Sequence, residues 1–86
     1  MDEFFIKKAY KKAKKHSDNK PLSKCLAYPN AIGFLFEYPG EVTYGGPGYI
    51  LVYDDGTVKE MPTNIENQEF FSQGILIDAS ELPFLL

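Results

Sequence analysis

Short apolar runs separated by turn residues fill the chain between residues 22 and 61. In Ala31–Tyr38, the clearest run, aromatic and aliphatic side chains at every second position indicate a strand with one buried face. Asp55-Gly56 suits the positive backbone angles of a tight hairpin turn. The other runs with strand composition are Leu22–Tyr28, Tyr49–Tyr53 and Val58–Met61. This part of the chain predicts a small antiparallel sheet of three to five strands.

A basic amphipathic helix is predicted over residues 2–16, ahead of the sheet. At about 100° per residue, its apolar side chains gather within an arc of about 140°. These side chains are Phe5, Ile6, Ala9, Tyr10 and Ala13. The remaining arc holds the lysines Lys7, Lys8, Lys11, Lys12, Lys14 and Lys15. The pattern predicts a helix that packs on the sheet, turns its lysines outward and ends before Pro21, which cannot continue it.

A second, short helix is predicted over residues 64–73, after the hairpin. Thr63-Asn64-Ile65-Glu66 fits a capping box, in which the Thr hydroxyl and the Glu carboxylate accept hydrogen bonds from free backbone N–H groups. Residues 74–86 are expected to form a last strand and an apolar tail that packs against the domain. The 86 residues have room for one domain. The predicted class is α+β, with a single domain over residues 1–86.

The two signs of charge are separated along the chain. The first 24 residues hold eight lysines and three carboxylates, for a formal charge of +5, whereas residues 25–86 hold one lysine and nine carboxylates, for −8. An acidic surface speeds and selects the binding of a cationic partner, although ordinary solubilising charge explains the excess equally well. The carboxylates expected to contact such a partner are Glu37, Glu41, Asp54, Asp55, Glu60, Glu66 and Glu69.

The lysine arc supports a second interpretation, in which the first helix binds an anion such as nucleic acid. The lysines that would make these contacts are Lys7, Lys8, Lys11, Lys14 and Lys15. The overall charge of −3 and the absence of arginine oppose this interpretation, because Arg is the usual residue for reading phosphates and bases. The apolar arc is also small for a helix that lies on a membrane. Nucleic acid is therefore the alternative to a protein partner, and no membrane partner is expected.

Few side chains in the sequence are candidates for a catalytic or metal-binding site. His16 and Cys25 are the sole histidine and cysteine, and nothing in the sequence supplies a third group to orient them or to complete a zinc site. Asp54 and Asp55 adjoin at a turn, where both would be solvated. Gly45–Gly48 is not followed by the Lys-Ser or Lys-Thr of a phosphate loop. We therefore expect no enzyme activity, no cofactor and no metal.

The sequence also bears on the cellular compartment. A lone cysteine cannot form an internal disulfide, which favours a reducing compartment. The chain has no apolar run of roughly 18 residues, and its lysines follow Phe5 instead of preceding an apolar stretch as in a signal peptide. A cytoplasmic protein is expected, and the oligomeric state stays open.

Residues 33–63 combine an aromatic strand after glycine, a Gly-Pro pair, an apolar strand, an Asp-Gly turn, a further strand and a helix start. The residues concerned are Gly33-Phe34-Leu35-Phe36, Gly46-Pro47, Tyr49–Tyr53, Asp55-Gly56-Thr57-Val58 and Thr63. This segment resembles the small YrhB-like immunity proteins of bacterial polymorphic-toxin systems. The resemblance implies a compact α+β sheet behind a first helix, and a role in neutralising a cognate toxin or in chaperone-like binding. We therefore expect a non-enzymatic protein-binding module, an immunity-like protein that neutralises a cationic toxin through its acidic surface.

Overall fold

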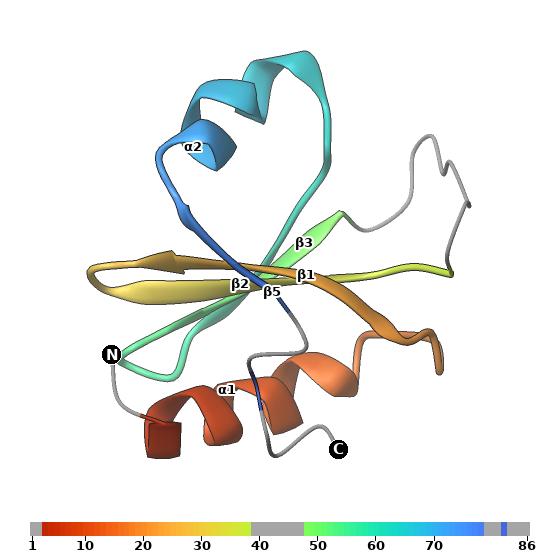
Figure 1. Ribbon diagram of the computed structural model, residues 1–86, viewed down its shortest axis with the longest axis vertical. Coiled ribbons are helices and arrows are strands. Elements are labelled where there is room, and N and C mark those ends of the chain that lie inside the picture. Colours follow the sequence, from red (N-terminus) through yellow and green to blue (C-terminus); the bar gives the residue numbers. More distant parts are fainter. Residues whose placement is uncertain (1–2, 39–47, 79–81, 83–86) are drawn as a thin grey trace.

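An antiparallel sheet forms the middle layer of the molecule (Figure 1). The computed structural model describes residues 3–38, 48–78 and 82. Within these residues the sheet has five strands, in the order β4-β3-β2-β1-β5. Their bounds are Leu22–Tyr28 (β1), Ala31–Phe36 (β2), Tyr49–Tyr53 (β3), Val58–Met61 (β4) and Ile75–Asp78 (β5). The predicted α+β class and its antiparallel sheet are confirmed.

The first four strands lie in the sheet in chain order. Each of them pairs antiparallel with the strand before it. β5 returns after the second helix and pairs with β1 at the other edge, with Cys25 opposite Ile77. The strand that was predicted to reach Tyr38 ends at Phe36. The backbone N–H of the next residue, Glu37, donates a hydrogen bond of 3.0 Å to the Pro21 carbonyl oxygen.

The first helix, α1 (Glu3–Lys14), covers one face of the sheet (Figure 1). Its predicted apolar arc is confirmed, because Ile6, Ala9 and Ala13 are buried. The predicted range of 2–16 is slightly long at its C-terminal end. There the chain turns, with Asp18 and Asn19 at φ angles of 53° and 63°. These left-handed positions end the helix before Pro21 is reached.

The main core lies between α1 and this face of the sheet. The strand residues packed there alternate with residues of the opposite face, as the sequence pattern predicts. The Tyr10 ring of α1 meets Phe34 edge to face, with 5.8 Å between ring centroids. Leu82 joins the same core, in agreement with the expected packing of the C-terminal tail, whose other residues lie outside the described part of the chain. The buried strand residues of this core are Cys25, Ile32, Phe34, Phe36, Ile50 and Val52.

A second helical layer lies over the opposite face (Figure 1). It consists of a 3-10 turn, η1 (Ile65–Asn67), followed by α2 (Gln68–Ser72). The Phe70 ring stacks on Tyr28 at 4.5 Å, and the Phe71 ring lies 4.7 Å from Tyr49. The Tyr28 hydroxyl also donates a hydrogen bond of 2.7 Å to the Phe70 carbonyl oxygen. These contacts attach a short helix that would not be stable alone.

The start of this second helical layer corrects one prediction. Asn64, not Thr63, is the N-cap, because its side-chain oxygen accepts a hydrogen bond of 3.1 Å from the Asn67 N–H. The Asn67 side chain in turn donates to the Pro62 carbonyl at 2.9 Å. Asn and Thr are both good caps, so residue type alone does not decide between these adjacent positions. The predicted capping box between Thr63 and Glu66 is therefore wrong.

Candidate functional site

The sheet divides the charged side chains between its two faces. Alternation along each strand sends neighbouring residues to opposite faces, so the register assigns every charged strand residue to the α1 side or the α2 side. Lys59 pairs with Leu51 and Lys24 with Asp78, which places all four on the α2 side. Glu60 pairs with Ile50 of the main core and therefore lies on the α1 side.

The α1 side carries the lysines of the first helix. The six lysines of α1 and the following residue, Lys7, Lys8, Lys11, Lys12, Lys14 and Lys15, are all exposed. Two of them rest on aromatic rings of the same helix, since Lys8 Nζ lies 4.6 Å from the Phe4 centroid and Lys14 Nζ lies 5.9 Å from the Tyr10 centroid. The lysine arc predicted from the sequence is therefore a continuous solvent-facing surface, which we call the lysine face.

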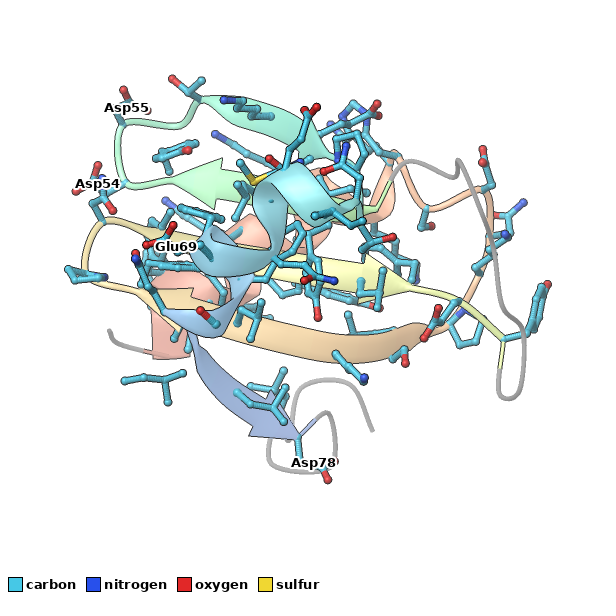
Figure 2. All side chains as sticks on the ribbon, turned by 90° about the horizontal axis from the view of Figure 1, so that it is seen from above. Asp54, Asp55, Glu69 and Asp78 are labelled. Atoms are coloured by element: carbon cyan, nitrogen blue, oxygen red, sulfur yellow. The ribbon has the colours of Figure 1, made fainter. Side chains whose placement is uncertain are left out.

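Carboxylates gather on the α2 side and at its rim. Glu66 and Glu69 are exposed on the second helical layer. Figure 2, which looks onto this side, shows Glu69 on α2, Asp54 and Asp55 at the hairpin tip, and Asp78 at the end of β5. Asp78 was missed by the sequence reasoning, because only the register of β5 against β1 shows which side it occupies. The described carboxylates of this acidic side are Glu37, Asp54, Asp55, Glu66, Glu69 and Asp78.

Glu37 is the least accessible of these carboxylates. It is half-buried at the end of β2 and accepts a hydrogen bond of 3.2 Å from the Ser23 hydroxyl. It also lies near Tyr49 on the α2 side. Burial is the main cause that raises the pKa of the Tyr49 phenol, and the negative charge of Glu37 adds to it. Glu37 therefore contributes more to the electrostatic field of the acidic side than to direct contacts with a partner.

The tip of the β3–β4 hairpin is held in one conformation. The Asp55 carboxylate accepts a hydrogen bond of 2.8 Å from the Thr57 N–H, which closes an Asx turn. The hydrogen bonds with Thr57, assisted by the charge of Lys12, lower the pKa of Asp55 below its ordinary value. The Asp54 N–H donates to the Asn30 carbonyl at 2.9 Å, which ties the tip to the β1–β2 turn. The two carboxylates are thus fixed at the rim between the two sides.

The predicted acidic residues do not form a single patch. Glu60 is separated from the second helical layer by the sheet, and its carboxylate lies 3.4 Å from His16 Nδ1 at the end of α1. Glu41 lies outside the described residues. The remaining five of the seven lie on the α2 side or at its rim. Sequence order alone cannot show this division, because Lys59 and Glu60 are adjacent in the chain and point to opposite sides.

His16 and Cys25 are not brought together. Cys25 is fully buried in the main core, and burial raises the pKa of its thiol to about 12. A thiol with that pKa stays protonated at neutral pH and is a poor nucleophile. His16 is exposed on the α1 side beside Glu60. The pair therefore has neither the proximity nor the ionisation that nucleophilic catalysis requires.

A groove of about 360 Å³ lies between α1 and the β3–β4 hairpin. Its lining combines apolar side chains of the helix and of β3 with three charged side chains, Lys8, Lys12 and Asp54. Sequence reasoning did not identify this groove. Phe4, which lines it, is not among the residues of the predicted apolar arc. The lining residues are Phe4, Phe5, Lys8, Ala9, Lys12, Val52, Tyr53, Asp54 and Gly56.

Two further properties concern the described residues. Among them, no three His, Cys, Asp or Glu side chains converge as metal ligands would. None of the helices in residues 3–38 and 48–78 has the length and apolar character needed to cross a bilayer.

No protein-family model, curated protein or solved structure matches the chain.

Proposed function

We propose that the protein is a non-enzymatic protein-binding module, an immunity-like protein that neutralises a cationic toxin through its acidic side. The observation that carries this proposal is the separation of charge by the sheet. Within the described residues, the α2 side and its rim present six carboxylates and two lysines, whereas the lysine face lies on the other side. A cationic partner would therefore be attracted to one side of the molecule and repelled from the other.

The attachment of the second helical layer to the sheet supports this proposal. The second helical layer is attached by two aromatic contacts and by the Tyr28–Phe70 hydrogen bond, so Glu66 and Glu69 stand on a fixed support. Ile65, next to Glu66, is 84% exposed and offers an apolar contact among the charges. Interfaces commonly combine a small apolar centre with a polar rim. Limited rearrangement on binding keeps the entropic cost of association low.

The gene directly upstream provides the test. The proposal expects this gene to encode a secreted toxin with a basic C-terminal domain. Co-expression of the present chain should protect cells from that domain, and the two purified proteins should elute together in size-exclusion chromatography. A basic toxin domain that is neither bound nor neutralised by the chain would overturn the proposal.

The lysine face supports a second candidate function, a nucleic-acid accessory role. Six exposed lysines on and directly after a helix of 12 residues could contact successive phosphates. Fluorescence anisotropy with labelled DNA and RNA at two salt concentrations tests this role. Binding should be strong at low salt and fall steeply as the salt concentration rises, because phosphate contacts release counterions. An absence of binding at roughly 50 mM salt would remove this candidate.

A further inference from the structure

Among the described residues, the groove between α1 and the β3–β4 hairpin shares Asp54 with the acidic contacts of the proposed function and is otherwise distinct from them. We propose that it binds an acidic segment of a partner protein, which places one large apolar side chain in the groove and carboxylates against Lys8 and Lys12. This interaction differs from that of the cationic partner, because apart from Asp54 it uses the α1 side of the sheet.

The volume and lining of the groove suit a single large side chain. Its volume of about 360 Å³ is near the lower end of ordinary ligand pockets. Phe5 and Ala9 from the helix and Val52 from β3 give it apolar walls. Phe4 lines the groove and is 67% exposed, so a phenyl ring remains in water beside it. An apolar side chain bound here would remove that surface from water, which is favourable.

The charged side chains around the groove favour an occupant with negative charge. Lys8 and Lys12 line the α1 wall, and the other lysines of the lysine face extend the positive field along the helix. Asp54 lines the hairpin wall opposite. Carboxylates of the occupant should therefore face the helix and not the hairpin.

Lys12 is placed to respond to such a carboxylate. Its Nζ lies 3.5 Å from the Gly56 carbonyl oxygen, across the groove from α1 to the hairpin. This distance is at the limit of a hydrogen bond, and the contact is exposed. A charge-assisted hydrogen bond to a carboxylate is shorter and stronger. Replacing the weak contact of Lys12 with Gly56 by a hydrogen bond to a carboxylate therefore favours an anionic occupant over an empty groove.

The apolar walls also favour a peptide over nucleic acid. Phosphate contacts alone would use every exposed lysine of α1 about equally. A segment anchored in the groove depends on Lys8 and Lys12 more than on Lys7 and Lys14. At about 100° per residue, the latter pair lies on the flank of α1 that is turned away from the groove. This difference between the two lysine pairs separates the two kinds of ligand.

The test uses a short fluorescent peptide with one phenylalanine among aspartates, titrated into the full chain and followed by anisotropy. The Lys8→Glu/Lys12→Glu variant should lose at least about tenfold in affinity, because both carboxylate contacts become repulsive. The Lys7→Glu/Lys14→Glu variant carries the same change of net charge and should lose less than about threefold, since its charges lie farther from the peptide. Equal losses in the two variants would show binding by charge alone and overturn the proposal.

Three further measurements address the apolar anchor and the occupant. A peptide with serine in place of phenylalanine should bind at least about tenfold more weakly, and equal binding would contradict insertion into the groove. In an NMR titration, the amide signals of Ala9, Val52 and Gly56 should shift on peptide binding. Sedimentation of the protein alone provides the last control. Concentration-dependent association that is abolished in Lys8→Glu/Lys12→Glu would identify a second copy as the occupant and overturn the assignment to a partner segment.

Discussion

Cys25 shows how burial sets the chemistry of a side chain in this domain. Its thiol pKa is about 12 in the folded protein, against 9.0 for an accessible thiol. Above pH 9 the unfolded chain loses this proton while the folded protein keeps it. The stability contributed by the buried thiol is thus fully present below pH 9 and is lost as pH rises toward 12.

We therefore predict that the free energy of unfolding falls between pH 7.5 and pH 10.5 more steeply in the wild type than in Cys25→Ala, measured by urea denaturation. The variant should be less stable at pH 7.5, because it leaves a small cavity in the core. Parallel pH profiles for the two proteins would contradict the assigned thiol pKa.

Gly48 and Gly56 both have positive φ angles but differ in their surroundings. At Gly48, with φ of 70°, a Cβ atom would clash with the Met61 carbonyl oxygen and lie 2.7 Å from the Pro62 Cα. At Gly56, with φ of 91°, the nearest atom would be Lys12 Nζ at 3.1 Å, the end of a flexible side chain. Gly48 thus permits close contact between the start of β3 and the end of β4.

The predicted cost of a Gly→Ala change follows from this difference. Gly56→Ala should lower the free energy of unfolding by about 1–2 kcal/mol, the cost of a left-handed backbone. Gly48→Ala should cost more, at least about 3 kcal/mol, because backbone atoms must also move. Thermal or urea denaturation of the two variants measures both values. Equal costs would contradict the close approach at Gly48.

At the scale of elements, α2 depends on its contacts with the sheet. It is five residues long, and the described part of this helix has no fully buried residue. The Tyr28 hydroxyl and ring are the most direct connection to the sheet, through the carbonyl and the ring of Phe70. Loss of that hydroxyl should therefore loosen the second helical layer and leave the main core intact.

We predict that Tyr28→Phe lowers the free energy of unfolding by about 0.5–1.5 kcal/mol, the usual net value of one hydrogen bond. Amide hydrogen exchange in residues 68–72 should accelerate, because local opening becomes easier. Tyr53→Phe is the control, since within the described residues its hydroxyl has no such hydrogen bond. Its effect should stay below about 0.5 kcal/mol. Unchanged exchange in α2 of Tyr28→Phe would show that this bond does not attach the helix.

At the scale of the whole molecule, the sequence predicted features that depend on nearby residues. Alternation over Ala31–Tyr38 and the Asp55-Gly56 turn were enough to predict β2 and the β3–β4 hairpin. The register of β5 on β1 and the division of Glu60 from Glu69 depend on pairings far apart in the chain. The groove was missed for the same reason, because its two walls come from α1 and from the hairpin.

A cationic partner should bind the acidic side of the molecule and not the lysine face. Glu69→Lys and Glu60→Lys make the same chemical change on opposite sides of the sheet, at two exposed residues. Calorimetric titration with the proposed basic toxin domain should show at least about a tenfold loss of affinity for Glu69→Lys and less than about threefold for Glu60→Lys. Equal losses, or a larger loss for Glu60→Lys, would contradict the claim that the acidic side is the binding surface.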